Sequence, residues 1–227
     1  MLDEYSRTYH HHLSGDGPSS ESGAHSKPTY RAAKRSFDIL VTLAAAPVVI
    51  AIVAIAALLV RMDGSSAFYR QPRLGKNGRV FNIWKLRTMV PDAERRLQEH
   101  LTENAAARIE WDRVQKLRDD PRITAIGHYL RKYSVDELPQ LLNVFLGQMS
   151  LVGPRPMCPE QRSQYPGSAY FEMLPGITGL WQISERNSCS FAERAMYDSR
   201  YARIMSFSTD MRILLLTPLA VLKGTGL

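Results

Sequence analysis

The longest apolar stretch of the chain runs from Ile39 to Val60, and no charged residue interrupts it. A helix needs about 20 residues to cross the hydrocarbon core of a bilayer, so this run predicts a membrane helix. Pro47 lies inside the run, where it removes a backbone hydrogen bond and is expected to kink the helix. Two topologies remain open. A single kinked span is favoured by the run itself, and the alternative is a re-entrant hairpin with both ends on one membrane face.

The residues before the apolar run have a different character. Residues 1–30 are rich in Ser, Gly, His and charge, which predicts a disordered tail. Basic residues flank the run on both sides, so the charge pattern gives no orientation. The predicted organisation is a tail at 1–30, a membrane anchor at 31–62 and a cytosolic, membrane-associated domain at 63–227.

Alternation of apolar and polar positions follows the anchor. Residues 68–89 predict a β-hairpin with Asn77-Gly78 in its turn. Its strands are expected near residues 67–69 and 79–85. Lys85 and Arg87 are two positions apart, so a strand directs both cations to one face, where they can line a pocket.

Helical patterns account for most of the remaining chain. Helices are expected at 91–117, from a cap at Thr124 to about Lys132, at 190–201 and at 210–223. The last of these is strongly apolar but too short to span a membrane comfortably, so it lies at the interface or completes the core. The fold class predicted is α+β and mainly helical.

Two adjacent carboxylates, Asp136 and Glu137, form the first candidate site. They lie at the expected start of a helix, close to Arg131. Anions are stabilised at a helix N-terminus, so both carboxyls are expected to ionise readily. Ser134-x-x-Glu137 is also a capping box, and the local pattern by itself favours capping over catalysis. The alternative is that an ionised Asp136 acts as nucleophile or metal ligand.

Two rigid loops and a later acidic residue add further candidates. Arg155 lies between two prolines, which fix the backbone of a side chain suited to bidentate phosphate recognition. A second loop, PGITGLWQ, carries Trp181 and Gln182, an aromatic and an amide suited to a base or a sugar. Asp198 either pairs with an arginine, which is slightly favoured, or reaches the site.

The net charge of +7 widens the choice of partners and does not decide it. A basic balance suits nucleic acid, an anionic membrane surface or a phosphate-rich substrate. An apolar fraction of 44% is enough for most of the chain to fold. Two cysteines are too few for a disulfide framework, which favours a reduced domain that faces the cytoplasm.

Six motifs in order resemble the bacterial sugar transferase family, the monotopic phosphoglycosyl transferases. They are Lys34-Arg-x-Phe-Asp38, Lys85-x-Arg-Thr-Met89, Asp120-Pro-Arg-Ile-Thr124, Leu130–Gln140, Met149–Pro156 and Pro175–Gln182. The resemblance covers the chain from Lys34 to its end. It implies transfer of a sugar-1-phosphate from a UDP-sugar to undecaprenyl phosphate, with release of UMP. This step initiates exopolysaccharide or related glycan assembly, and galactose and glucose rank first as the sugar.

The resemblance also implies roles for individual residues. Asp136 would attack the β-phosphate to form a covalent phosphosugar intermediate and would contact Mg²⁺, with Glu137 completing the dyad. Further positions are expected to contact phosphate or nucleotide groups: Lys85, Arg131 and Arg155, which match basic family positions, Arg87 from the strand pattern, and the acidic Asp198.

The family's architecture implies a re-entrant membrane helix, a small hairpin and amphipathic interface helices around a cytoplasmic catalytic core. Its helix is broken at a Ser-Pro pair, where this chain has Ala46-Pro47. The implied location is the bacterial inner membrane, with its lipid and downstream glycosyltransferases as partners. The alternatives are an inactive scaffold of a polysaccharide assembly complex and a membrane-anchored nucleic-acid-binding protein. The chain has no nucleic-acid recognition motif, so no nucleic-acid partner is expected.

Overall fold

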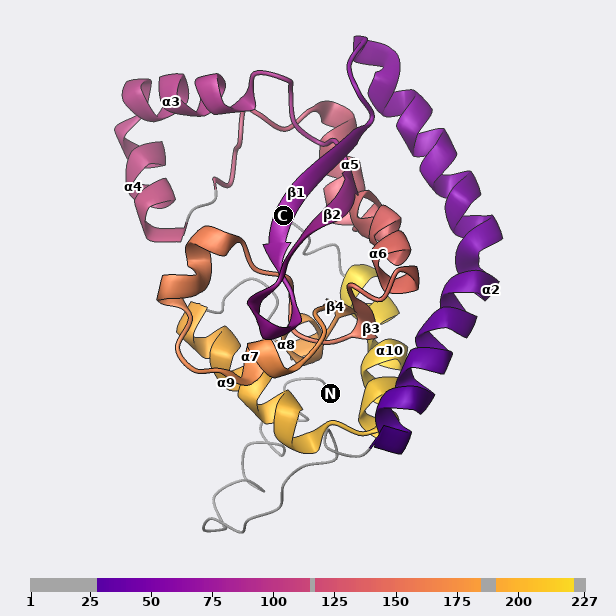
Figure 1. Ribbon diagram of the computed structural model, residues 1–227. Helices are drawn as coiled ribbons and strands as arrows, with labels where there is room; N and C mark the ends of the chain where they lie inside the picture. The colour runs from indigo at the N-terminus through magenta and orange to yellow at the C-terminus, as the bar shows by residue number, and fades with distance from the viewer. Residues whose placement is uncertain (1–27, 115–116, 185–190, 223–227) are drawn as a thin grey trace.

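The computed structural model describes residues 28–114, 117–184 and 191–222 (Figure 1). The predicted tail therefore lies outside the described residues, except that residues 28–30 belong to the first turn of α2 (Pro28–Val60). The fold is mainly helical with a small β content, as predicted. The remaining elements, in chain order, are η2 (Arg61–Asp63), β1 (Phe68–Leu74), η3 (Lys76–Gly78), β2 (Val80–Leu86), α3 (Ala93–Glu103), α4 (Ala105–Val114), α5 (Ala125–Lys132), η4 (Val135–Gln140), α6 (Leu141–Phe145), β3 (Ser150–Val152), η5 (Pro159–Gln164), α7 (Ala169–Glu172), β4 (Gly176–Thr178), α8 (Leu180–Ser184), α9 (Phe191–Ile204) and α10 (Phe207–Leu222), where η denotes a 3₁₀ helix.

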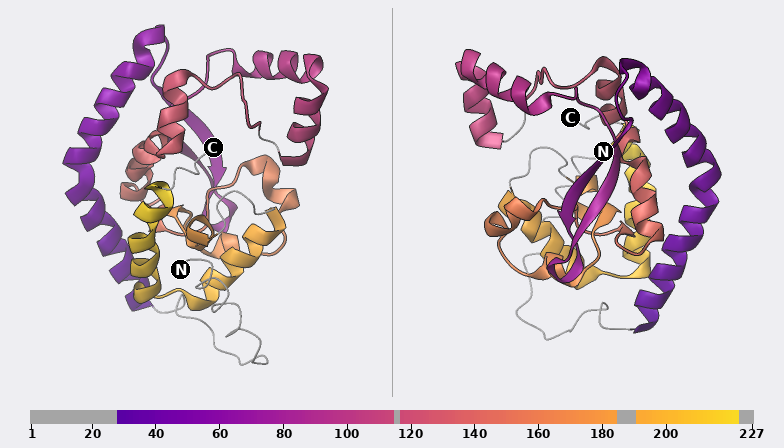
Figure 2. Two further views of the ribbon diagram at one scale, coloured as in Figure 1. Left: turned by 180° about the vertical axis from the view of Figure 1, so that it is seen from behind. Right: turned by 45° about the horizontal axis from the view of Figure 1, so that its top comes forward.

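The apolar run forms the long helix α2, which is long and apolar enough to cross a membrane. Only 17% of its most apolar 18-residue window is buried, unlike the core helix of a soluble protein. The helix continues through Pro47 as one element, so the structure does not show two helices joined at the proline. Figures 1 and 2 show it bowing along one side of the molecule, opposite α3 and α4.

The predicted hairpin is confirmed, with strands β1 and β2 paired antiparallel. Asn77 (φ 59°) and Gly78 (φ 73°) both adopt the left-handed conformation that a tight hairpin turn requires. The first strand is longer than predicted, because it continues through Pro72 to Leu74. Within the described chain β1 pairs with β2 alone, and a proline is tolerated on such an edge strand.

The single helix predicted at 91–117 is instead two helices, α3 and α4. Asn104 lies between them in an extended conformation, and its Oδ1 accepts a hydrogen bond from the Ala107 N–H at 3.0 Å. Asparagine is a favoured N-cap residue, so this side chain starts the second helix where the pattern of helix formers suggested continuity. The two helices share a small core of their own, made by Leu97, Leu101, Ala107 and Leu117.

The central core lies where β2, α6, β3, α9 and α10 meet. Its most deeply buried side chains are Ile83, Val144, Met149, Val152, Tyr201 and Ile213. Strands β3 and β4 pair in parallel beside it, which brings the two rigid loops of the sequence next to each other. One face of α10 therefore completes the core, while its exposed face carries Leu215, Leu219 and Leu222.

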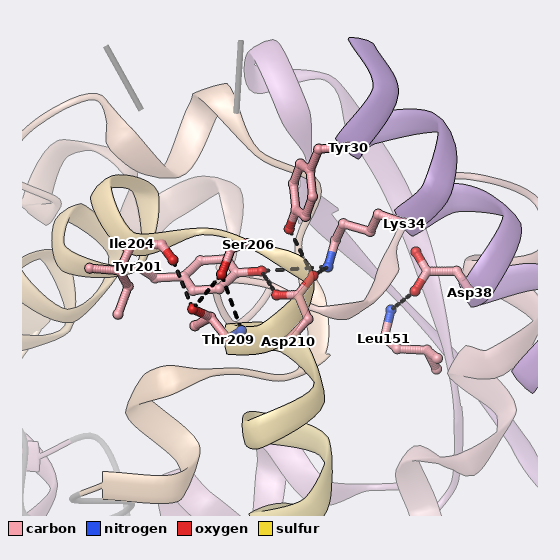
Figure 3. A network of polar contacts seen from close by, with 9 residues as sticks. All are labelled: Tyr30, Lys34, Asp38, Leu151, Tyr201, Ile204, Ser206, Thr209 and Asp210. Carbon is pink, nitrogen blue, oxygen red and sulfur yellow. Dashed lines mark hydrogen bonds and ion pairs between the residues drawn. The ribbon is translucent and has the colours of Figure 1, made fainter. Parts of the chain in front are cut away.

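A buried polar network joins the start of α2 to the C-terminal helices (Figure 3). The Lys34 ammonium lies 2.6 Å from Asp210 Oδ2, and Tyr30 donates to the same oxygen at 2.7 Å. Tyr201 donates to Asp210 Oδ1 at 2.5 Å. Asp210 is almost fully buried, and each of its carboxylate oxygens has a donor. These contacts fix the first turns of α2 on the domain.

Two further residues of α2 bind the backbone of the domain. Asp38 accepts a hydrogen bond from the Leu151 N–H of β3 at 3.2 Å. Arg35 donates to the Val144 and Phe145 carbonyls, which end the short helix α6. The motif that begins at Lys34 therefore supplies side chains that attach α2 to the elements around the site.

Candidate functional site

The carboxylate pair lies in η4, a 3₁₀ helix, and not in the first turn of an α-helix. Ser134 precedes it in the left-handed conformation (φ 55°), whereas an N-cap residue adopts an extended one. Its hydroxyl caps no backbone N–H of the described helix. The capping-box interpretation of Glu137 is therefore wrong. Its carboxylate receives hydrogen bonds from two distant cations instead.

Those cations come from two different elements. Lys85 on β2 donates to Glu137 Oε1 at 2.8 Å, and its ammonium lies 3.7 Å from Asp136 Oδ2. Arg155, in the Gly-Pro-Arg-Pro loop after β3, donates to the same Glu137 oxygen at 3.0 Å. The structure thus brings together four of the predicted residues, Lys85, Asp136, Glu137 and Arg155.

The two carboxylates have opposite electrostatic environments. Arg155 and Lys85 together hold the pKa of Glu137 well below its usual range, despite burial. Burial raises the pKa of Asp136, and Glu137 adds to this, while Lys85 opposes the rise. The direction of the pKa shift agrees with the expectation of ready ionisation for Glu137 and runs against it for Asp136. A neighbouring pair whose pKa values are pushed apart is suited to two different chemical roles.

Arg131 approaches the pair from the last turn of α5. Its Nε donates to the Thr88 hydroxyl at 2.8 Å, which fixes the half-buried guanidinium. Its positive charge helps to lower the pKa of Asp136. Thr124 caps α5 as predicted, accepting a hydrogen bond from the Gly127 N–H at 2.9 Å.

Arg87 is directed to backbone carbonyl groups and not to the carboxylate pair. It donates to the carbonyls of Ser66 and Met89, and to that of Val60 at the end of α2. The shared face of Lys85 and Arg87 required the strand to continue, but β2 ends at Leu86. The predicted phosphate contact of Arg87 therefore loses the strand geometry on which it rested.

A cavity opens beside Glu137, and sequence reasoning missed several residues that line it. Its lining combines cations, the carboxylate and loop residues: Arg73, Ile83, Lys85, Glu137, Gln140, Arg155, Pro156, Gly176 and Ile177. Arg73 pairs with Phe81 in the hairpin register, so it shares a strand face with Lys85. A two-residue Asn77-Gly78 turn would place Arg73 opposite Asn82, on the other strand face. The observed register differs by one residue, with Leu74 opposite Val80, so the turn signal in the sequence did not reveal Arg73.

Asp198 lies in a second cavity next to the first. The lining residues are Arg155, Pro156, Met157, Gln161, Tyr165, Trp181, Arg194 and Asp198. Tyr165 donates to Asp198 Oδ2 at 2.9 Å, and burial raises the pKa of Asp198 to about 7. Both cavities share Arg155 and Pro156, so Asp198 belongs to a compartment that adjoins the carboxylate pair.

The described residues contain no group of three or more His, Cys, Asp or Glu side chains arranged to hold a metal ion. Mg²⁺ is commonly bound by one or two carboxylates together with substrate phosphates and water. Asp136 and Glu137 supply oxygen ligands of the right type, and Glu137 lines a cavity that also contains Arg73, Lys85 and Arg155. The residues therefore fit a magnesium ion that is completed by substrate.

Comparison with known proteins gives a consistent result. A sequence model described as bacterial sugar transferase matches residues 29–224. The exopolysaccharide production protein ExoY of Sinorhizobium fredii is 43% identical over 203 residues, which cover 88% of this chain and 90% of that protein. The undecaprenyl-phosphate galactose phosphotransferase of Salmonella typhimurium is 39% identical, over 88% of this chain and 42% of that protein. The undecaprenyl-phosphate glucose phosphotransferase of Komagataeibacter xylinus is 37% identical, over 81% of this chain and 35% of that protein. The chain thus spans nearly all of the first relative and less than half of the other two.

Proposed function

Because the chain belongs to the bacterial sugar transferase family, we propose that it transfers a sugar-1-phosphate from a UDP-sugar to undecaprenyl phosphate and releases UMP. Two of the relatives are named for transfer of galactose or glucose to this lipid, so these are the first sugars to test. The product would initiate exopolysaccharide or related glycan assembly, in keeping with the name of the ExoY relative.

The observation that carries this proposal is the arrangement of Asp136 beside Glu137, Lys85 and Arg155. Asp136 is only 7% exposed, and Glu137 next to it is held ionised by two cations. A carboxylate that attacks a phosphate must overcome repulsion between two anions. Fixed cations in a partly dehydrated site offset that repulsion.

The reaction proceeds by two displacements at the same phosphorus atom. An Asp136 oxygen forms a bond to the β-phosphorus of the UDP-sugar while the bond from that phosphorus to the bridging oxygen breaks, and UMP leaves with the electron pair. An oxygen of undecaprenyl phosphate then attacks the phosphorus, and the bond to Asp136 breaks. A covalent intermediate divides one difficult transfer into two easier ones. Lys85 and Arg155 are positioned to stabilise the charge in both steps.

Asp136 would help to hold a magnesium ion, together with the substrate phosphates. When bound, it supplies positive charge that neutralises the phosphate oxygens. Arg131 and Arg73 would hold the remaining phosphate oxygens, since both are basic groups next to the cavity or the carboxylate pair. Glu137 keeps Lys85 and Arg155 oriented toward the reacting group.

Membrane attachment would follow from α2 and the exposed face of α10. Leu40, Val48 and Ile55 on α2 are each more than 60% exposed, as is Leu215 on α10. A lipid substrate must reach the carboxylate pair from the membrane, so an apolar surface beside the site is required. We place the enzyme at the bacterial inner membrane with the site facing the cytoplasm, where UDP-sugars are made.

The decisive experiment is Asp136→Asn in the full chain reconstituted in lipid nanodiscs with Mg²⁺. UMP release from a panel of UDP-sugars, with undecaprenyl phosphate present, is expected to fall by at least about 1,000-fold, since the nucleophile is lost. Asp112→Asn is the matched control, because Asp112 lies on α4 with its side chain 58% exposed. Full activity of Asp136→Asn would exclude the assigned nucleophile. A wild-type chain without UMP release would favour an inactive scaffold.

A further inference from the structure

The second cavity differs in chemistry from the cavity beside Glu137. The first is lined by three cations, Arg73, Lys85 and Arg155, as a phosphate site requires. The second shares Arg155 and adds Arg194, Asp198, Gln161 and the aromatic residues Tyr165 and Trp181. Its carboxylate offsets part of the positive charge, and its aromatic and amide groups suit a part of a substrate other than phosphate.

Trp181 provides a second observation that points to a ligand. The residue is only 5% exposed, and its Nε1 has no hydrogen-bond partner among the described residues. A buried donor without an acceptor is costly, and a ligand oxygen is one way to satisfy it. Guanidinium groups already lie over its ring, with Arg194 at 4.3 Å and Arg155 at 5.8 Å from the ring centroid.

Asp198 is held in position by contacts that leave it able to accept more hydrogen bonds. Tyr165 donates to Oδ2, and a carboxylate offers about four acceptor sites. Tyr165 is itself fixed by edge contacts with the Tyr170 and Phe171 rings, at 5.7 and 6.2 Å between centroids. Gln161 adds an amide that can both donate and accept. Sugar hydroxyl groups, which donate and accept in close pairs, match this set.

We propose that the cavity formed by Asp198, Tyr165, Gln161 and Trp181 binds sugar hydroxyl groups of the UDP-sugar, with Asp198 as their principal acceptor. The inference rests on the proposed function and assigns a part of the donor to each cavity. A diphosphate at Arg155 has the hexose on one side and the ribose on the other, so either ring is a candidate to reach Asp198. The shared chemistry is a hydroxyl pair, and the experiment decides which ring supplies it.

The burial of Asp198 supports this role. Burial raises the pKa of Asp198 to about 7, because its charged form loses contact with water. Hydroxyl donors from a ligand would supply the hydrogen bonds that water no longer provides.

The test is a cycle between protein variants and donor analogues, measured as kcat/KM for UMP release in nanodiscs. The donor is the UDP-sugar that the wild-type chain uses best, together with analogues that each lack one hydroxyl of the hexose or of the ribose. In the wild type, removing the hydroxyl bound by Asp198 is expected to cost about 10- to 100-fold, since its acceptor is charged. In Asp198→Asn and Tyr165→Phe the ratio of kcat/KM between the intact donor and that analogue is expected to be smaller than in the wild type. For Asp198→Asn this ratio should approach one.

The identity of the sensitive analogue assigns the ring. A hexose analogue identifies the cavity as the sugar-specificity site, and a ribose analogue identifies it as the nucleoside site. Asp112→Asn serves as control and should keep every wild-type ratio. If all analogues show the same penalties in Asp198→Asn as in the wild type, the proposal is overturned. The transferase function would still stand in that case, because it is tested by wild-type UMP release.

Discussion

At the scale of single residues, neighbours in sequence have unlike roles because they have unlike surroundings. Glu137 receives two cationic hydrogen bonds, while Asp136 is buried with its nearest ammonium at 3.7 Å. Adjacent positions of a 3₁₀ helix point in different directions, so Glu137 faces both Lys85 and Arg155, whereas Asp136 does not. The pair works as a unit, since Lys85 contacts both members.

Replacing Lys85 by Met tests this shared dependence. The change removes one of the two cations on Glu137 and the ammonium closest to Asp136. We expect kcat for UMP release to fall by about 100- to 1,000-fold, similar to the loss of one fixed donor at a charged transition state. Lys132→Met on the exposed side of α5 is the control. Wild-type kcat in Lys85→Met would contradict the assigned role.

Asp198 allows a prediction about stability and pH. The unfolded chain ionises this group near its ordinary pKa of about 3.9, whereas the folded protein does so at about 7. Between those values the folded state holds a proton that the unfolded chain has lost, so its contribution to stability falls as pH rises. Tyr165 and Tyr170 face the carboxyl from the neighbouring elements, and Arg194 from its own helix.

Asp198→Asn removes this titration. Between pH 5 and pH 8 the unfolding free energy of the variant relative to wild type should rise by about 2–3 kcal/mol, from two units at 1.4 kcal/mol each. Thermal midpoints of the substrate-free protein in detergent, measured at both pH values, give this difference. A constant difference across the range would show that the carboxyl is not buried in its neutral form.

At the scale of elements, close contacts between α5 and the segment that follows the hairpin position the residues of the site. Gly127 packs so closely on this segment that an added Cβ would lie 2.1 Å from the Thr88 carbonyl oxygen. Thr88 also accepts the hydrogen bond from Arg131. The glycine therefore sets the distance between α5 and the strand that carries Lys85.

Gly127→Ala is expected to destabilise the protein by about 1–3 kcal/mol through overpacking, although alanine favours a helix. UMP release should fall too, because α5 carries Arg131 into the site. His128→Ala at the exposed neighbouring position is the control and should be close to neutral. Thermal midpoints and kcat measured together check both parts, and a stabilised Gly127→Ala would refute the close contact.

At the scale of the whole molecule, both ends of α2 pack on the same domain. Lys34 binds Asp210 near the start, and Val60 packs against Leu86 and Leu130 at the end. The middle of the helix is largely exposed, and Figure 1 shows it bowing away from the domain between its two attached ends. A straight span would carry one end about 30 Å to the far side of the bilayer, which these contacts oppose. The re-entrant arrangement stays a prediction, and a spanning α2 would have to give up one of these two contacts with the domain.

Cysteine labelling tests this topology in a Cys158→Ser, Cys189→Ser background. Arg31→Cys and Met62→Cys place exposed thiols just before and just after the apolar run. A membrane-impermeant maleimide should label both in inverted inner-membrane vesicles and neither in intact spheroplasts. Asp112→Cys reports the side on which the domain lies. Labels on opposite faces would establish a span and rule out re-entry.

Much of the candidate site could be predicted, because its residues lie in local motifs with strong sequence signals. Asp136, Glu137, Lys85 and Arg155 were all named from such motifs, and they meet in the structure. The phosphate contact of Arg87 stays a prediction, but it loses the strand argument, because β2 ends at Leu86 and the guanidinium donates to backbone carbonyls. Arg73 was missed because its face depends on the register of a hairpin partner, which a single strand does not reveal.

The sequence by itself determined the family, the apolar helix, the Asn77-Gly78 hairpin and the identity of the carboxylate pair, since each depends on neighbouring residues and backbone preference. Tertiary structure alone decided what those carboxylates experience. Lys85 and Glu137 are 52 positions apart, and Tyr165 and Asp198 are 33 apart. Burial and long-range pairing arise only when such segments pack. They shift the pKa values of Asp136 and Glu137 in opposite directions and place Asp198 beside a second cavity.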